Sequence, residues 1–163
     1  MNRTQASWRE RWRKFRAHTP GQRALILRAA RNECLALAGL RLLGFRRCKR
    51  LIERFSLSPQ GHNSSVECAT PERAIQMIRA AQSVERNLPL RPNCLERSLA
   101  LWWMLRREGF PAELHIGARQ GPQGFEAHAW VEDGGRVLND SPDVHRHYAR
   151  FDAPIAAAGA GSR

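Results

Sequence analysis

The hydrophobic pattern changes its period at Pro111, and this change constrains the fold more than any other feature of the sequence. Before it, an apolar segment from Asn93 or Cys94 to Glu108 has helical spacing and stops at Gly109. The apolar residues of that helix are Leu95, Leu99, Trp102, Trp103 and Leu105. Because they cover more than one stripe of its surface, we expect the helix to lie deep in the fold.

After Pro111, apolar and polar residues alternate, which predicts β-strands. We expect strands at 112–118, 126–132 and 136–139, with a turn at 120–124 and a tight hairpin turn at 133–135. Helices followed by an antiparallel meander indicate an α+β fold, in which a sheet packs its apolar face on one long helix.

The N-terminal third is predicted to be helical. Trp8, Trp12 and Phe15 indicate a short amphipathic helix within residues 1–20, and helical spacing continues over 22–37 and 40–55. Residues 56–69 are rich in turn-forming residues and are predicted to form a loop or linker. The run Thr70-Pro71-Glu72 has the composition of a helix start, and that helix should end near Asn87.

These patterns suggest a division of the chain within one compact domain. We expect a basic helical segment at 1–58, a core at 59–152 and an Ala/Gly-rich, disordered tail at 153–163. All of the net charge of +12 belongs to the first segment, which has 15 Lys or Arg against three acidic residues, while the remainder is neutral. The basic face is either solvated or docks an acidic peptide or protein; nucleic acid or an anionic membrane is the third alternative.

The four cysteines, Cys34, Cys48, Cys68 and Cys94, have no regular spacing, so neither a zinc site nor a disulfide framework is predicted. No segment has the layout of a signal peptide or of a membrane span. We therefore expect a protein of the reducing cytoplasm, without a cofactor or metal. The neutral remainder and the lack of a helix-turn-helix or zinc-finger pattern argue against nucleic-acid binding.

Three residues could form a cysteine nucleophile site. Cys94 stands at a helix start, where free N–H groups favour a thiolate and could bind an oxyanion. His128 lies on a strand between small alanines and could act as general base, while Asp140, one hairpin later, could orient it. Alternatively, Cys94 is a small buried residue, His128 is structural and Asp140 begins a turn.

Four motifs carry a resemblance to a known family. Arg-Pro-Asn-Cys-Leu-Glu-Arg-Ser-Leu-Ala-Leu, Leu-Arg-Arg-Glu-Gly-Phe-Pro-Ala-Glu-Leu-His-Ile-Gly-Ala-Arg, Glu-Ala-His-Ala-Trp-Val-Glu and Val-Leu-Asn-Asp occur in order within about residues 70–141. They resemble the lasso peptide leader peptidases, which have a transglutaminase-like, papain-related fold. The resemblance implies a Cys-His-Asp triad with Cys94 as nucleophile, His128 as base and Asp140 as orienting residue.

The resemblance also implies a reaction and partners. The enzyme would cut the leader from a lasso precursor peptide, often after a Thr at the leader's penultimate position. The freed amine would then be joined to an Asp or Glu side chain by a separate ATP-dependent cyclase similar to asparagine synthetases. Residues 1–55 show no strand-rich recognition module. This is similar to the split version, in which a separate PqqD-like protein recognises the leader.

Two expectations remain open at this stage. The Arg-rich surface, including Arg28, Arg31, Arg46 and Arg47, is expected to dock the recognition protein or the leader. The function could also be that of a transglutaminase-like acyltransferase, because the same triad serves water or an amine as acceptor. A basic scaffold without enzymatic activity is the further alternative.

Overall fold

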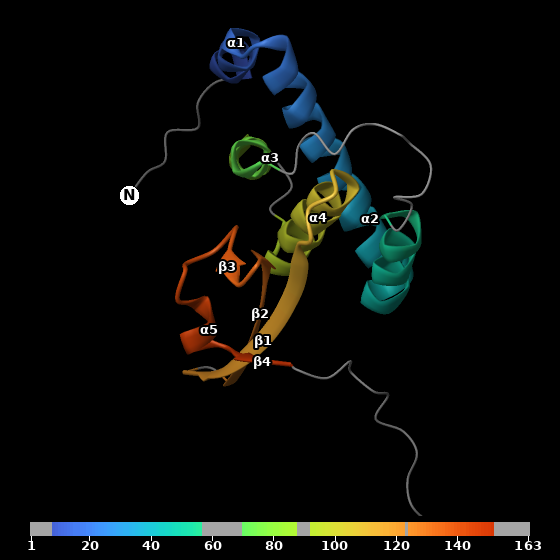
Figure 1. Cartoon of the computed structure of the whole chain (residues 1–163), viewed down its shortest axis with the longest axis vertical. Coiled ribbons are helices and arrows are strands. Elements are labelled where there is room, and N and C mark those ends of the chain that lie inside the picture. Colours follow the sequence, from blue (N-terminus) through green and yellow to red (C-terminus); the bar gives the residue numbers. More distant parts are fainter. Residues whose placement is uncertain (1–7, 57–69, 88–91, 123, 152–163) are drawn as a thin grey trace, which may run out of the picture.

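The computed structural model describes residues 8–56, 70–87, 92–122 and 124–151. Helices form one side of the molecule and an antiparallel sheet the other, and helix α4 (Cys94–Arg107) packs against both α2 and the sheet (Figure 1). The predicted α+β arrangement is therefore confirmed. Residues 57–69 of the predicted linker, and the predicted tail, lie outside the described residues.

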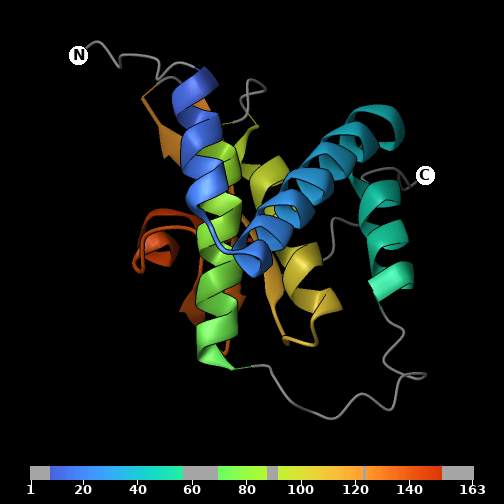
Figure 2. The ribbon, with the colours of Figure 1, turned by 90° about the horizontal axis from the view of Figure 1, so that it is seen from above.

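The N-terminal helices are α1 (Trp8–Ala17) and α2 (Pro20–Ser56). The predicted gap between residues 37 and 40 is wrong, because the helix continues to Gly44, where a φ of 73° breaks it into two arms. Glycine adopts this backbone conformation without steric cost. The arms lie at an angle to one another, as the blue and teal ribbons of Figure 2 show.

Gly39 lies in the predicted gap between the two helices and makes a close contact in the structure. A Cβ atom at Gly39 would lie 2.7 Å from the Sγ atom of Cys48, so the missing side chain lets this buried cysteine approach the first arm. Gly39 therefore serves the contact between the two arms and does not end the helix.

Helix α3 (Pro71–Asn87) begins as predicted, and the start of α4 is fixed by a reciprocal cap. The Glu96 N–H donates to Oδ1 of Asn93 over 2.9 Å, and the Asn93 N–H donates to Oε2 of Glu96 over 2.8 Å. This capping box makes Cys94 the first residue of the helix.

The core lies on both sides of α4. Met77 of α3, Leu99 and Leu105 of α4, and Val131 of the sheet have no measurable exposure, and Ala36 of α2 joins them. Burial of each large side chain contributes about 1.5–3 kcal/mol relative to exposure. The helix that carries Cys94 is thus held by α2, α3 and the sheet together. Among the described residues, no helix has the length and apolar character needed to cross a membrane.

The sheet has the order β3-β2-β1-β4. Its strands are β1 (Glu113–Gly121), β2 (Gly124–Asp133), β3 (Arg136–Val137) and β4 (Ala149–Arg150), and a short helix α5 (Val144–His147) precedes β4. The sequence pattern did not predict α5 or β4. Strand β4 pairs with β1 at Gly117, where a Cβ atom would lie 2.9 Å from the carbonyl oxygen of Ala149 and 2.9 Å from the Trp130 ring.

The third strand is shorter than the predicted 136–139, for a reason seen in its hydrogen bonds. The Leu138 N–H donates to the Val131 carbonyl oxygen over 2.9 Å, but the Val131 N–H donates to the side chain of Asn139, to Oδ1, over 2.8 Å. A side chain thus replaces the main chain as the partner of β2, and the strand ends.

Candidate active site

Cys94 is a free, partly buried thiol at the first position of α4. The carbonyl oxygen of Asn93 accepts the Arg97 N–H, and the Asn93 side chain accepts that of Glu96. The N–H groups of Cys94 and Leu95 therefore remain as the open donors of this helix end, since the first N–H groups of a helix have no intrahelical acceptor. Asn93 serves as the N-cap of this helix.

His128 and Asp140 are brought together. Nε2 of His128 lies 2.6 Å from Oδ2 of Asp140, while Oδ1 of the same carboxylate accepts the Ser141 N–H over 2.7 Å. A carboxylate beside Nε2 favours the tautomer that carries its proton there, which leaves Nδ1 as the basic nitrogen of the ring. The contact expected from the sequence is present; the catalytic roles stay predictions.

A buried hydrogen-bond hub connects the three segments that carry these residues. The hydroxyl group of Ser98, which is fully buried, donates to the Ala129 carbonyl oxygen over 2.8 Å. The hydroxyl oxygen of Ser98 in turn accepts a 2.9 Å hydrogen bond from Nδ2 of Asn139. Ser98 lies one helical turn after Cys94, Ala129 follows His128, and Asn139 precedes Asp140.

This hub locates Cys94 relative to β2. Residues four apart share one face of a helix and are about 6 Å apart along its axis. Cys94 therefore lies about one turn from the point where Ser98 contacts β2 beside His128. Within the described part of the chain, Cys94 and His128 form neither a hydrogen bond nor an ion pair with each other, and catalytic contacts in unliganded enzymes are often longer than in the complex.

Two aromatic rings lie roughly parallel to the His128 imidazole. The Tyr148 ring centroid lies 4.8 Å from that of His128, and the Trp130 centroid lies 6.4 Å from it. The guanidinium of Arg119 lies 4.8 Å from the Tyr148 ring, and we regard this as a cation–π contact. The sequence pattern did not single out Tyr148, because it follows the predicted sheet and its contact with His128 depends on α5 and β4.

The buried carboxylate of Glu132 holds the strand that follows Tyr148. Arg150 and the Trp130 indole N–H both donate to Oε1 of the buried Glu132, the latter over 2.7 Å. Burial alone would raise the pKa of Glu132, but these hydrogen bonds outweigh it and the pKa is lowered. Nε2 of His115 lies 3.6 Å from the Glu132 carboxylate. His115 thus belongs to this structural network.

A second group of acids lies beside the start of α4. Burial, reinforced by the nearby carboxylate of Glu85, raises the pKa of Glu33 to about 7. Its Oε1 atom is buried without a hydrogen-bond partner. Burial also raises the pKa of Glu85, although Arg97 lies 3.6 Å from it.

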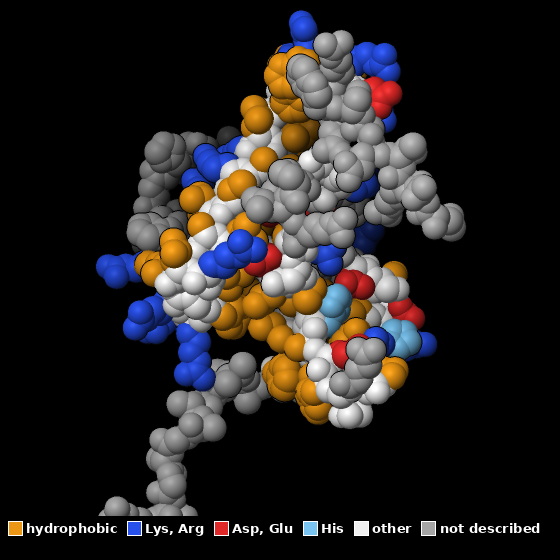
Figure 3. Space-filling view, turned by 180° about the vertical axis from the view of Figure 1, so that it is seen from behind, with side chains coloured by type: hydrophobic (Ala, Val, Ile, Leu, Met, Phe, Trp, Pro, Cys, Tyr) orange, Lys and Arg blue, Asp and Glu red, His pale blue; other side chains and the backbone are white. Residues whose placement is uncertain are grey.

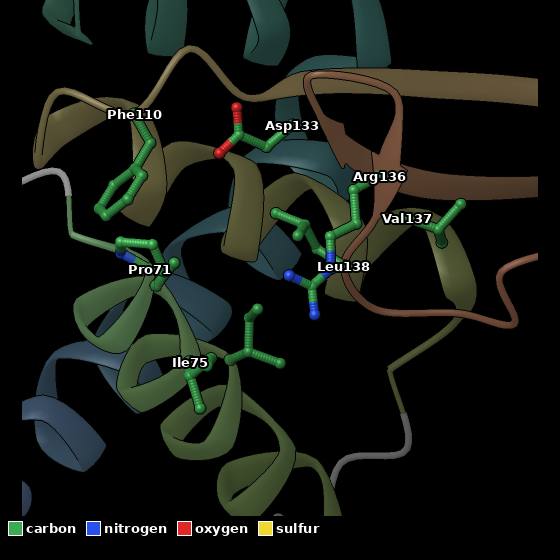
Figure 4. A pocket seen from close by; sticks show the side chains of 9 residues that line it. Pro71, Ile75, Phe110, Asp133, Arg136, Val137 and Leu138 are labelled. Carbon is green, nitrogen blue, oxygen red and sulfur yellow. The ribbon is translucent and has the colours of Figure 1, made fainter.

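A small cavity opens between α3 and the hairpin of β2 and β3 (Figure 4). Its volume is about 200 Å³, and its walls are mainly apolar, with Asp133 and Arg136 as the charged side chains. Leu138 lines it from the hairpin. None of the three candidate catalytic residues lines this cavity. Among the described residues, no group of His, Cys, Asp or Glu side chains is arranged to hold a metal ion.

The helix that begins with Cys94 packs on an antiparallel sheet, and His128 of that sheet contacts Asp140 just after β3. This arrangement agrees with a transglutaminase-like class of protein. The family model described as "Transglutaminase-like superfamily" matches residues 39–151. The chain belongs to this superfamily. The match begins within α2, so part of the basic helical segment is included in it.

A more particular similarity is shorter. Over 52 residues the chain is 44% identical to the microcin J25-processing protein McjB of Escherichia coli. The aligned segment is 32% of this chain and 24% of that protein, so the chain spans about a quarter of the length of the curated relative that it matches. No solved structure matches the chain.

Proposed function

We propose that this chain is a cysteine endopeptidase that removes the leader from a lasso peptide precursor. The observation that carries the proposal is the 2.6 Å contact between His128 and Asp140 in a transglutaminase-like chain whose α4 begins at Cys94. The similarity to a protein named for processing microcin J25 supports a peptide substrate. The free thiols of Cys34, Cys48 and Cys94 agree with the reducing cytoplasm as the place of the reaction.

The proposed acylation step uses both ends of the His128 ring. Nδ1 accepts the thiol proton as the Cys94 sulfur attacks the carbonyl carbon of the scissile peptide bond. The oxyanion of the tetrahedral intermediate accepts hydrogen bonds from the N–H groups of Cys94 and Leu95. The C–N bond then breaks, and His128 passes its proton to the leaving amine, which is the N-terminus of the core peptide. Asp140 stabilises the imidazolium between these transfers.

Water completes the reaction. His128 accepts a proton from water as its oxygen attacks the thioester carbon, and the C–S bond breaks to return the Cys94 thiol and a leader with a free carboxylate. The free core amine is the group that a separate cyclase, similar to asparagine synthetases, would join to a side-chain carboxylate. In the acyltransferase alternative, an amine takes the place of water and a new amide results.

Leader recognition is proposed to come largely from a separate PqqD-like protein. Residues 8–56 fold as two helices and do not themselves form a strand-rich recognition module. The chain should then cleave slowly by itself and faster with the recognition protein present.

The experiment incubates the full chain, a PqqD-like recognition protein and a lasso precursor peptide, and measures product masses. We expect two fragments whose masses sum to that of the precursor plus one water. Replacement of Cys94 by Ala should lower the rate by at least about a thousandfold. Cys34→Ala, which removes an exposed thiol on α2, is the matched control and should retain the rate. A product that contains a new amide would favour the acyltransferase, and cleavage by Cys94→Ala would exclude the proposed nucleophile.

A further inference from the structure

Helix α2 carries leucines on the face that points away from the core. Leu27, Leu35 and Leu42 are 60%, 50% and 82% exposed. At about 100° per residue, they fall within about 80° of each other on the helix surface, opposite the buried Ala29 and Ala36. Helices at the surface of a globular protein are normally polar on this side, so an apolar outer face indicates that something covers it.

The outer face forms one continuous strip on the first arm of α2. Leu27 and Leu42 are about 22 Å apart along the helix axis, or about four turns. Figure 3 shows hydrophobic side chains in a row along this helix, with Lys and Arg side chains on both sides. Cys34, an exposed free thiol, lies within the row. We call Leu27, Arg31, Cys34, Leu35 and Leu42 the outer strip.

The charge around the strip has one sign. Arg31 is exposed at the middle of the strip, and Arg41, also exposed, lies at its edge, 3.9 Å from Glu96. Glu33, the one acidic residue of the first arm, is buried on the opposite face. A ligand for this strip must therefore combine an apolar ridge with carboxylates.

The positive charge of the outer strip argues against three other ligands, namely a second copy of the chain, another part of the same chain and an anionic membrane. A second copy of the chain would bring arginines against arginines. The parts of the chain outside the described residues offer few carboxylates, since 57–69 contains one Glu, 152–163 one Asp and one Arg, and 1–7 and 88–91 one Arg each. An anionic membrane would require the guanidinium of Arg31, in the centre of the strip, to enter the apolar layer, where burial of a charge is costly.

We propose that the outer strip binds an amphipathic helix of a partner protein, whose apolar ridge covers Leu27, Leu35 and Leu42 and whose carboxylates pair with Arg31 and Arg41. This surface is separate from the candidate active site, and the proposal does not rest on peptidase activity. It also moves the expected docking surface. Arg28, one of the arginines first considered, forms a 2.6 Å ion pair with Glu108, so reversal of its charge would disturb the fold as well.

The test uses the full chain and synthetic helical peptides of about five turns. One peptide has a leucine ridge with Glu flanks, a second has Ser in place of the ridge leucines, and a third has Lys in place of Glu. We expect the first to bind at least about tenfold more tightly than the other two, measured by fluorescence anisotropy. Binding should also slow alkylation of Cys34, read by mass spectrometry, while alkylation of Cys94 in the same sample is unchanged.

Variants assign the binding to the strip. Leu27→Ser, Leu35→Ser and Leu42→Ser combined should weaken binding of the Glu peptide by about tenfold or more, whereas Leu51→Ser on the second arm, also exposed, should not. Circular dichroism checks the fold of the triple variant. Arg31→Glu should weaken binding of the Glu peptide and strengthen that of the Lys peptide, and this exchange does not depend on the triple variant folding.

Several outcomes would overturn the proposal. These are equal affinity for the Leu and Ser peptides, no binding of the Glu peptide at concentrations on the order of 0.1 mM, or no exchange of preference by Arg31→Glu. Binding to phosphatidylglycerol vesicles that the leucine substitutions abolish would assign the strip to a membrane. A dimer in sedimentation that the same substitutions dissociate would assign it to a second copy.

Discussion

The side-chain amide of Asn139 donates a 2.9 Å hydrogen bond to the hydroxyl oxygen of Ser98, across 41 residues of sequence. Ser98 in turn donates to the Ala129 carbonyl oxygen. Through these two bonds, the helix of Cys94, the strand of His128 and the segment of Asp140 meet at one buried point. The relative positions of the three candidate catalytic residues therefore depend on a serine and an asparagine that need not contact the substrate.

Replacement of Ser98 by Ala should leave the Ala129 carbonyl oxygen and the Asn139 amide without a buried partner. We expect a loss of about 1–3 kcal/mol in the free energy of unfolding, measured in urea. We also expect the rate of cleavage at saturating precursor to fall more than KM rises, because the reacting groups move while substrate binding is kept. Ser83→Ala on α3 is the control. If the Ser98→Ala protein is less stable but cleaves the precursor at an unchanged rate, the hub has only a structural role.

The Tyr148 ring centroid lies 4.8 Å from that of His128, and two substitutions of Tyr148 test whether this stacking positions His128. Tyr148→Ala should admit water to the His128–Asp140 hydrogen bond and lower kcat/KM by about tenfold, with a changed pH profile. Tyr148→Phe keeps the stacked ring and should resemble the wild type. If the two variants behave alike, the stacking has no part in positioning His128.

The raised pKa of Glu33 predicts the direction in which the stability of the protein changes with pH. Burial raises its pKa from the ordinary 4.5 to about 7 in the folded protein. As pH rises between these values, the unfolded chain releases this proton first, so this group lowers the free energy of unfolding across the window and has no further effect above it. Glu33→Gln should therefore gain stability relative to wild type from pH 5 to pH 8 in urea titrations.

The control for that comparison is Glu53→Gln. Glu53 forms a 2.6 Å ion pair with Lys49 on the partly exposed second arm of α2, and surface pairs of this kind contribute little. The difference between wild type and Glu53→Gln should stay nearly constant over the same pH range. A matching pH dependence in the two variants would contradict the assignment to Glu33.

Gly117 tests the close approach of β4 to β1. Gly117→Ala would place a Cβ atom 2.9 Å from a backbone oxygen and from the buried Trp130 ring, neither of which can move freely. We expect a loss of about 1–3 kcal/mol in thermal unfolding. Gly21→Ala in the first turn of α2 meets no atom within 4 Å and should be neutral or slightly stabilising. Equal effects at the two sites would show that β4 can yield.

Local sequence patterns predicted much of this arrangement. Helical spacing of the apolar residues predicted a helix that starts at Asn93 or Cys94, and the capping box of Asn93 and Glu96 sets the start at Cys94. The hairpin after β2 predicted that His128 and Asp140 would meet, since only twelve residues separate them. These features could be predicted because the residues that form them are close in sequence.

Other features depend on contacts between distant segments. The bond between Ser98 and Asn139 and the stacking of Tyr148 on His128 follow from how α4, α5 and β4 pack, which no periodicity encodes. The continuation of α2 between residues 37 and 40 and its break at Gly44 were missed for the same reason. Cys48 packs closely against Gly39 from the second arm.

Three consecutive residues after β3 each meet a different part of the molecule. Leu138 lines the cavity against α3, Asn139 holds Ser98 and the Val131 N–H, and Asp140 contacts His128. This stretch cannot change its length, because one added residue would turn either the amide or the carboxylate away. The turn at Gly134-Gly135 precedes all three contacts, so a loop or affinity tag inserted there would leave the register of the site intact.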